Sequence, residues 1–554
     1  MGRGLGRAGG EDLPRFARRI VDEQIARCGV CPPQAECGAE NKAGQDGEPE
    51  ASARQLAQDG LTGPLGNLKI VARDERSVTP QSEDFADWYN DVIFRAELVD
   101  RGPVRGSMVI RPYGYRIWEL LQADLDGRIK ATSHQNAYFP LLIPQSYMQR
   151  EAEHVEGFAP ELFTVTHAGG KELEEPLVIR PTSETIIGEM MAKWISSHRD
   201  LPLLLNQWAN VLRWEMRPRM FLRTSEFLWQ EGHTAHATAA EATAETMLAL
   251  SFYQDVAVEI AALASVPGEK TPGERFAGAE RTFTVEAMMR DGRALQAGTS
   301  HLMGTNFAAA FGITYAGESG TAELCHTTSW GMSTRMVGGV VMTHGDDKGL
   351  VLPPALAPYQ VVVVPIGRGE QAETVSFAAT ELAGRLRRAG IRTHVDDRPQ
   401  VSPGFKFNDW EMRGVPLRLE LGPRDLAAGT ALMSRRLNYQ QPGAGKEAIP
   451  IDAAPDLLAA ELASFQAMLA RRAADFRDEH TAVVSSWPEF TAAVAVGWAL
   501  ALHCGEHACE DEIKAETAAT PRCIPLAGEP EQGACIRCGK PSAYGKRVIF
   551  ARAY

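Results

Sequence analysis

The pattern of hydrophobic and polar positions becomes regular near residue 82. Over residues 105–129 it predicts a short strand, a turn and an amphipathic helix, whose apolar face carries Ile117, Leu120, Leu121 and Leu125. A long helix is predicted over residues 239–264. Strands are predicted at residues 203–215, 226–233 and 338–344, and at residues 136–143 with an interruption at Pro140. This order of elements favours an α+β fold with an antiparallel sheet.

A proline-rich segment at residues 351–359 marks the clearest domain boundary. After it, the order strand, helix, strand, helix, strand over residues 360–421 predicts a compact α/β domain. A further helix is predicted over residues 456–479. The apolar stretch 490–504 is shorter than the ~18 residues that a membrane helix needs, so we expect a buried helix there and no membrane span.

The composition is that of an ordinary globular protein. The chain has 554 residues, 44% hydrophobic and 23% charged, with a net charge of −14, which excludes a collagen and a wholly disordered chain. Residues 1–80 contain one aromatic residue, Phe16, and predict a low-complexity, disordered extension. Its three cysteines, Cys28, Cys31 and Cys37, are either incidental thiols or part of a metal site. No secretory signal is recognisable, which favours a cytoplasmic enzyme; an Arg-rich transit peptide is the alternative.

Four blocks carry charged residues at spacings that suit a bound polyphosphate, at residues 180–185, 210–238, 292–301 and 329–346. In the second block Arg213 and Glu215 lie two apart on a predicted strand, so they share a face, and a cationic loop follows. In the fourth block Arg335 follows small residues that let a ligand approach the backbone. Two arginines from separate strands can clamp a phosphate. Each feature alone is more often a surface ion pair or a turn, but the four together are specific.

These blocks resemble the motifs of class II aminoacyl-tRNA synthetases, and the match to the prolyl-tRNA synthetase family is close, in its archaeal and eukaryotic-like form. NAYFPLLIP resembles motif 1 of the dimer interface, RWE with FLRT resembles motif 2, and GMSTR resembles motif 3. RPTSET, FLWQEGH and QAGTSH resemble the proline-specific additions, and the resemblance runs from Ser82 to Tyr554. Because proline donates no backbone hydrogen bond, Pro140 in motif 1 is expected at a sheet margin or a subunit contact.

The resemblance implies three domains after the extension of residues 1–80. They are a class II antiparallel-sheet catalytic domain over residues 81–352, an α/β anticodon-binding domain over residues 356–455, and a small C-terminal zinc-binding α+β domain over residues 456–554. It also implies a proline–tRNA ligase that works as a homodimer. Such an enzyme makes prolyl-adenylate from L-proline and ATP with Mg²⁺, and then transfers the prolyl group to tRNA(Pro).

Residue roles follow from the same resemblance. Arg213 would hold the α-phosphate and the proline carboxylate, Arg335 would hold the γ-phosphate, and these two are the expected catalytic residues. The implied ATP-binding residues are Arg213, Glu215, Arg223, Thr224, Gln296, Thr299, Ser333 and Arg335. The implied proline-binding residues are Thr182, Glu184, Arg213, Trp229, Glu231, Phe276 and His301. No protein nucleophile is needed, because positioning and charge stabilisation supply the catalysis.

Two close cysteine pairs near the C-terminus, Cys504 with Cys509 and Cys535 with Cys538, have the spacing of a structural Zn²⁺ site with four thiolates. Four reduced cysteines in a core are the alternative. The resembled family uses the two pairs as ligands, so Cys523 is left out of the predicted site.

The gap between FLWQEGH and QAGTSH is about 60 residues, which leaves no room for the editing insertion of bacterial-type relatives. In the anticodon-binding domain, the residues suited to the two guanines of a proline anticodon are Lys406, Glu420, Arg424 and Asp425, although surface ion pairs would look the same.

Two other functions are alternatives to a proline-specific enzyme. One is a catalytically inactive paralogue that binds tRNA, against which the intact Arg213, Glu215 and Arg335 argue. The other is a relative specific for another small amino acid such as threonine. The catalytic-site zinc ligands usual in threonine enzymes are missing from these motifs.

Overall fold

The computed structural model of the chain describes residues 78–148, 162–437 and 446–554. The predictions for the N-terminal extension, including Cys28, Cys31 and Cys37, lie outside the described residues. The first helix, α2 (Phe85–Arg95), is capped by the Asp84 side chain. It is followed by the hairpin β1 (Val99–Arg101) and β2 (Met108–Ile110) and by α3 (Pro112–Ala131). These elements confirm the strand and amphipathic helix predicted over residues 105–129.

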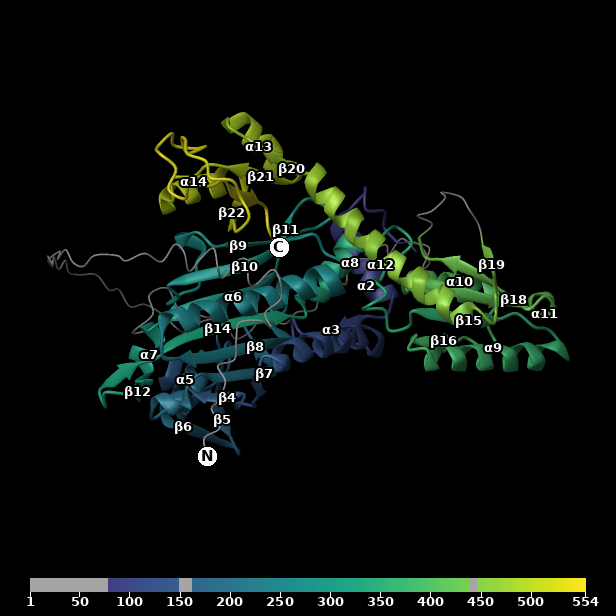
Figure 1. Cartoon of the computed structure of the whole chain (residues 1–554), viewed down its shortest axis with the longest axis horizontal. Helices are drawn as coiled ribbons and strands as arrows, with labels where there is room; N and C mark the ends of the chain where they lie inside the picture. The colour runs from purple at the N-terminus through teal and green to yellow at the C-terminus, as the bar shows by residue number, and fades with distance from the viewer. Residues whose placement is uncertain (1–77, 149–161, 438–445) are drawn as a thin grey trace, which may run out of the picture. The chain divides into compact units, whose positions relative to one another are not determined.

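The largest sheet among the described residues has eleven strands, in the order β20-β21-β23-β22-β9-β10-β11-β14-β8-β7-β3, most of which are labelled in Figure 1. From β22 to β7 every neighbouring pair is antiparallel, which confirms the predicted antiparallel sheet. Its catalytic-domain strands are β3 (Gln135–Asn136), β7 (Leu203–Leu212), β8 (Glu226–His236), β9 (Ser265–Glu269), β10 (Arg281–Met288), β11 (Ala294–Gly304) and β14 (His326–Ser333). The turns η1 (His198–Asp200) and η3 (Pro272–Glu274) precede β7 and β10.

Of two helices that pack on this sheet, one is predicted by the sequence as a helix and the other as a strand. Figure 1 shows α6 (Ala239–Asp255) lying along the sheet; it starts at a Thr238 capping box and passes into the π turn η2 (Val256–Ile260), so the long predicted helix is confirmed. The strand predicted at residues 338–344 is wrong, because this segment belongs to helix α8 (Arg335–His344). Every residue from Met336 to His344 is buried, so no polar face revealed the helical period.

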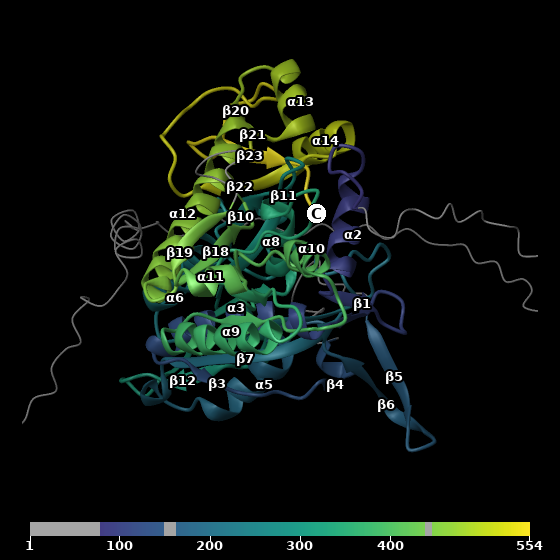
Figure 2. The same cartoon turned by 90° about the vertical axis from the view of Figure 1, so that its right-hand side faces the viewer.

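The strand predicted at residues 136–143 is also wrong. β3 ends at Asn136, and β4 (Leu142–Pro144) belongs to a separate sheet with β5 (Phe163–Ala168) and β6 (Lys171–Ile179). Pro140 lies exposed between β3 and β4, next to the edge strand of the large sheet, in agreement with a marginal position. Figure 2 shows β5 and β6 projecting as a hairpin. Other small elements are α5 (Glu184–Trp194), α7 (Asn306–Phe311), β12 (Thr314–Ala316) and β13 (Ala322–Leu324).

The α/β domain has a five-stranded sheet in the order β16-β15-β17-β18-β19. Its first part, β15 (Val361–Pro365), α9 (Gln371–Arg388), β16 (Thr393–Val395), α10 (Pro403–Met412) and β17 (Leu417–Leu421), has the predicted order, and β15 pairs in parallel with both β16 and β17. The sequence reading missed α11 (Pro423–Ala427) and the antiparallel strands β18 (Thr430–Arg435) and β19 (Glu447–Pro450).

Helix α12 (Ala454–Glu479) contacts α9 of the α/β domain and β20 of the C-terminal part, and both views show it running between these two parts (Figures 1 and 2). The C-terminal elements are β20 (Thr481–Val483), α13 (Trp487–Val496), β21 (Trp498–Ala501), α14 (His507–Thr517), β22 (Thr520–Pro525) and β23 (Val548–Ala551). Strand β22 pairs with β9, so the C-terminal strands continue the catalytic sheet.

The buried helix predicted at residues 490–504 is wrong, because α13 ends at Val496 and β21 starts at Trp498. Gly497 separates them, and a Cβ at this position would lie 2.1 Å from the His480 backbone oxygen. Among the described residues, none of the helices has the length and apolarity to cross a membrane.

Candidate active site

A cavity of about 250 Å³ opens on the face of the sheet formed by β8, β10, β11 and β14. Eleven residues named from the sequence line it: Thr182, Glu184, Arg213, Trp229, Glu231, Phe276, Gln296, Thr299, His301, Ser333 and Arg335. They come from positions between 182 and 335, so the fold brings all four sequence blocks to one place. The cavity therefore unites the predicted proline-binding residues with most of the predicted ATP-binding residues.

One carboxylate, that of Glu184, is held at the cavity by two hydroxyl groups. Thr182 Oγ1 donates to one Glu184 oxygen, and Ser329 Oγ donates to the other at 2.7 Å. Glu184 begins helix α5 and is largely buried, yet it faces the cavity. A buried carboxylate fixed in this way is a suitable partner for a cationic amine.

A second carboxylate, Glu231, is bound by protein groups on all sides. It accepts hydrogen bonds from Ser183 Oγ at 2.5 Å and Gln207 Nε2 at 2.7 Å, and it pairs with His233 Nε2 at 3.1 Å. Burial would raise the pKa of Glu231, but these hydrogen bonds outweigh burial and lower it. Burial would likewise lower the pKa of His233, and the bond to Glu231 raises it instead. Glu231 is therefore a charged wall of the cavity, fixed by its neighbours.

The apolar wall consists of rings. Phe276 stacks on His301 with ring centroids 4.5 Å apart, and Thr282 Oγ1 lies 3.1 Å from His301 Nδ1. Burial lowers the pKa of His301 to about 4, so the imidazole is neutral near pH 7. Trp229 closes another side. This combination of flat, uncharged surfaces beside Glu184 suits a small apolar ring that carries an amine.

Two guanidinium groups face the other part of the cavity. Arg213 Nε donates to the Pro181 carbonyl at 2.9 Å, and Arg335 Nε donates to the Leu222 carbonyl at 3.0 Å. Burial, followed by the charges of Arg213 and Arg223, lowers the pKa of Arg335 to about 10. These like charges repel one another until an anion binds between them, so the cavity is electrostatically prepared for a polyphosphate.

Three predicted ATP-binding residues lie in the β7–β8 loop and outside the cavity lining. Glu215 and Arg223 form an ion pair at 3.0 Å, and Thr224 Oγ1 donates to the Glu226 carbonyl at 2.7 Å. Strand β7 ends at Leu212, so the predicted shared strand face of Arg213 and Glu215 is wrong. Their side chains diverge because the chain has already entered the loop.

Sequence reasoning missed several lining residues, among them Phe227, Lys270 and Arg275. The period of two along β8 could have found Phe227, because Phe227, Trp229 and Glu231 are spaced two apart and therefore share one face of the strand. Arg213 lies over both the Phe227 and the Trp229 rings, at 5.5 and 5.6 Å. No comparable sequence signal pointed to Lys270.

The four predicted zinc-binding cysteines lie in the C-terminal domain as two contacting pairs, and Cys504, Cys509 and Cys535 belong to one group of close ligand atoms that does not include Cys538. The Sγ atoms of Cys509 and Cys535 lie 3.7 Å apart, and those of Cys504 and Cys538 lie 3.6 Å apart. Tetrahedral Zn²⁺ with bonds of ~2.3 Å to sulfur separates its sulfur ligands by about 3.8 Å, so these spacings fit.

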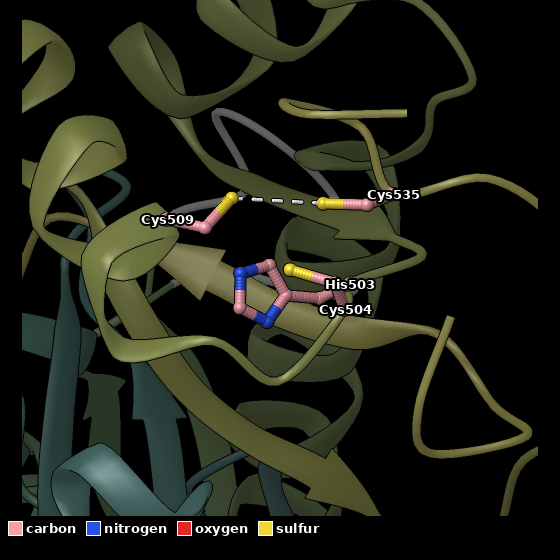
Figure 3. Close-up of side chains that lie close together, drawn as sticks. All are labelled: His503, Cys504, Cys509 and Cys535. Atoms are coloured by element: carbon pink, nitrogen blue, oxygen red, sulfur yellow. Dashed lines mark hydrogen bonds between the residues drawn. The ribbon is translucent and has the colours of Figure 1, made fainter. Parts of the chain in front are cut away.

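Figure 3 shows His503 beside Cys504, Cys509 and Cys535, and ligand atoms of these four residues lie within 4.8 Å of one another. His503 was missed from the sequence. Its Nδ1 accepts from the Gly505 N–H at 3.0 Å, while its buried Nε2 has no partner among the described residues. Cys523 lies in a separate apolar cluster, in agreement with its exclusion from the site.

The candidate anticodon-reading residues have partners within the domain. Buried Lys406 donates to the Asp396 carbonyl at 2.8 Å, and buried Glu420 pairs with Arg418 at 3.2 Å. Asp425 accepts from the Gly422 N–H at 2.8 Å. These contacts favour a structural role for Lys406, Glu420 and Asp425.

Comparison with known proteins gives the class. Residues 163–344 match the "tRNA synthetase class II core domain (G, H, P, S and T)", residues 360–461 match the "Anticodon binding domain", and residues 487–554 match "Prolyl-tRNA synthetase, C-terminal". The fold with its cavity is therefore that of a class II aminoacyl-tRNA synthetase.

The similar proteins define the family. "Proline--tRNA ligase 2" of Rhodococcus jostii (strain RHA1) is 70% identical over 87% of this chain and 100% of its own length. "Proline--tRNA ligase" of Mycobacterium leprae (strain Br4923) is 63% identical over 87% of this chain and 99% of its own. The solved prolyl-tRNA synthetase of Cryptosporidium parvum, in complex with halofuginone and AMPPNP, is 38% identical with a TM-score of 0.81, over 87% of this chain and 98% of its own. The chain belongs to the proline–tRNA ligases and is an enzyme of that class.

Proposed function

We propose that the cavity performs both steps of proline attachment to tRNA(Pro). The observation that carries this proposal is the placement of the Glu184 carboxylate and the Arg213 and Arg335 guanidinium groups in one cavity. Glu184 binds the secondary ammonium of L-proline, and the ring lies against Phe276 and His301. The arginines bind ATP, Arg213 at the α-phosphate and Arg335 at the γ-phosphate. The Cryptosporidium parvum relative, described with AMPPNP, supports an ATP site of this kind.

In the first step a proline carboxylate oxygen attacks the α-phosphorus of ATP, and the bond to pyrophosphate breaks. In the second step the terminal ribose hydroxyl of tRNA attacks the prolyl carbonyl carbon, and AMP leaves. Both steps depend on fixed positive charge and alignment of the reactants. Mg²⁺ that enters with ATP supplies further charge neutralisation of the triphosphate. Glu215, Arg223 and Thr224 are the further proposed nucleotide contacts, from the β7–β8 loop.

The decisive experiment is proline-dependent exchange of pyrophosphate into ATP. We expect exchange with proline, slower exchange with alanine and cysteine, and none with threonine. The side chains of alanine and cysteine fit the ring pocket, and each methylene group that they lack lowers the binding free energy by only ~1–3 kcal/mol. No exchange with any amino acid would favour the inactive tRNA-binding paralogue. Exchange restricted to threonine would favour the other alternative.

We propose that the enzyme lacks a hydrolytic editing activity. Between His236 and Ala294 the described chain forms α6, β9 and β10 with their connecting turns, all of which belong to the catalytic domain. Purified alanyl-tRNA(Pro) should therefore remain intact with this enzyme for as long as it does in buffer. Rapid deacylation would contradict this part of the proposal.

We infer a structural zinc site in the C-terminal domain, made by Cys504, Cys509, Cys535 and Cys538. The sulfur spacings support it, and His503 beside them is a fifth candidate ligand. Four thiolates leave no open coordination position, so the ion would hold the domain together without chemistry. Elemental analysis of the purified enzyme should give one zinc per chain.

We further propose a homodimer of the archaeal and eukaryotic-like form, acting in the cytoplasm. Apolar side chains near the sheet edge support a dimer, since Tyr138 is 75% and Trp194 49% exposed. The 38% identity with the Cryptosporidium parvum enzyme supports the form. Light scattering at micromolar concentration should give twice the chain mass, and a Tyr138→Glu variant should give more monomer.

A further inference from the structure

A buried charge network joins the C-terminal domain to the floor of the cavity. Its centre is Glu286 on β10, which is fully buried. Lys270 Nζ donates to Glu286 Oε1 at 2.8 Å, and Arg522, from β22, donates through Nε and Nη2 to Oε2, both at 3.1 Å. Thr284 Oγ1 adds a fourth donor at 2.9 Å. Lys270 and Arg522 are at most 9% exposed, so the whole network is shielded from solvent.

In this network two cations are hydrogen-bonded to one carboxylate. Burial would lower the pKa of Arg522, but the charges of Glu286 and Glu274 raise it. A buried ammonium group whose N–H donors lack partners costs several kcal/mol unless another group compensates it. Lys270 lines the cavity, and among the described residues Glu286 is the only hydrogen-bond acceptor of its Nζ. An ammonium group has three N–H donors, so two remain for a ligand.

The sheet fixes where the network acts. Glu286 is the register partner of Gln296 on β11, and Gln296 also lines the cavity. On the other side, Ile524 and Pro525 of β22 pair with Glu269 and Gly268 of β9, directly before Lys270. Arg522 therefore reaches Glu286 from a strand that the C-terminal domain adds to the catalytic sheet.

We propose that Lys270 donates a hydrogen bond to an anionic oxygen of the bound reactants, and that Arg522 positions Lys270 for this role through Glu286. The anion is either a phosphate of ATP or the carboxylate of proline. The C-terminal domain thereby becomes part of the adenylation machinery. This inference rests on the proposed active site, because it needs the reactants to occupy the cavity.

The first test compares Lys270→Met with the unaltered enzyme in pyrophosphate exchange. The loss of a preorganised donor should lower kcat/KM about 100-fold. A rise in KM for ATP would identify the phosphate as the partner, and a rise in KM for proline would identify the carboxylate. Removing Lys270 leaves Glu286 paired with Arg522, so the fold should survive. Lys270→Gln, which retains a donor to Glu286, is the second variant.

The second test addresses the positioning role of Arg522. Arg522→Met should lower kcat/KM about 3- to 30-fold. The double variant with Lys270→Gln, which keeps a donor to Glu286, should be no worse than Lys270→Gln alone, because Arg522 acts only through Lys270. The matched control is Arg547→Gln. Arg547 binds Glu531 and the Leu500 carbonyl inside the C-terminal domain, so its loss weakens that domain without touching the network.

Three outcomes would overturn the inference: unchanged kinetics in both Lys270 variants, additive losses in the double variant, or equal losses in Arg522→Met and Arg547→Gln. Each presupposes that the unaltered enzyme catalyses proline-dependent exchange. Failure of the unaltered enzyme would instead contradict the proposed function, so the two proposals fail in distinguishable ways.

Discussion

The cavity and the cysteine cluster are organised by different forces. In the cavity, three charged groups are held by the protein itself: Glu184 by two hydroxyls, Glu231 by three donors, and Arg213 by the Pro181 carbonyl. In the cluster, thiols contact one another, Cys509 with Cys535 and Cys504 with Cys538. The sheet therefore preorganises the cavity, whereas the cluster is where we propose that a bound ion joins the thiols.

This difference predicts opposite consequences of mutation. A group held by many partners in a cavity can be removed with little loss of fold, but the reaction loses a fixed charge. A thiolate removed from a metal site leaves the fold without its cross-link, because metal binding contributes folding free energy directly. Changes in the cavity should therefore affect rate, and changes in the cluster should affect stability.

The largest effect on exchange is expected for Arg335→Ala. Arg335 is the guanidinium with a markedly lowered pKa, crowded by Arg213 and Arg223, and it makes one side-chain hydrogen bond, to the Leu222 carbonyl. Exchange should fall about 100-fold or more, with an unchanged unfolding temperature. The control is Arg116→Ala on the outer face of α3, which should retain full activity. Near-normal exchange in folded Arg335→Ala would contradict the γ-phosphate assignment.

A smaller effect is expected for Glu184→Gln. The substitution keeps the shape and a hydrogen-bond acceptor but removes the charge that binds the ammonium. A hydrogen bond to a charged group contributes ~1.5–3 kcal/mol, so KM for proline should rise about 10- to 100-fold. The binding of alanine and of cysteine should weaken by the same factor, because each of them also carries an ammonium group.

The matched control for this variant is Glu226→Gln, since exposed Glu226 binds Asn210 at the start of β8. If Glu184→Gln changed only the preference for proline over alanine, Glu184 would be a wall of the ring pocket.

The same comparison explains what the sequence could predict. Strands β7 and β8 lie close to where the sequence predicts them, and the cavity residues were found because their motifs have fixed spacing. Helix α8 and the 490–504 segment were misread because they are nearly all apolar, and helix and strand periods then look alike. Gly497, which separates α13 from β21, gave the only local signal of the break.

The residues that escaped prediction depend on partners far away in the chain. Lys270 acquires its place from Glu286 and from Arg522, which is 236 residues beyond Glu286. Sequence spacing carries no information on such contacts, whereas it does specify close pairs such as Cys535 and Cys538. His503, by contrast, directly precedes Cys504, so its sequence position was a signal that the prediction did not use.

A modest effect on exchange, but a clear loss of stability, is expected for Cys535→Ser. This variant should lose its zinc and unfold at a lower temperature. Exchange at 25 °C should fall only a few-fold, because the disturbed C-terminal domain affects the cavity indirectly, through the pairing of β22 with β9. The control is Cys523→Ala, a buried cysteine outside the cluster, which should keep its zinc. Full zinc content in Cys535→Ser would show that His503 and the other thiols are enough to bind the ion, which would contradict the role of Cys535 as a required ligand.

The smallest effect concerns pH and the neutral wall of the cavity. Burial lowers the pKa of His301 from 6.5 to about 4, so between these values the unfolded chain binds a proton that the folded chain does not. Stability should therefore fall as the pH drops from about 6.5 to 4, by up to about 3 kcal/mol from this residue. His301→Gln, which does not titrate, should lose less stability than the unaltered enzyme between pH 7.5 and pH 5, when both are followed by thermal unfolding. At pH 7.5 the imidazole is neutral in both the folded and the unfolded chain, so proton binding to His301 does not change the stability at that pH. An equal acid loss in the two proteins would mean that His301 is protonated in the folded enzyme, and the cavity would then lack the uncharged wall that a proline ring requires.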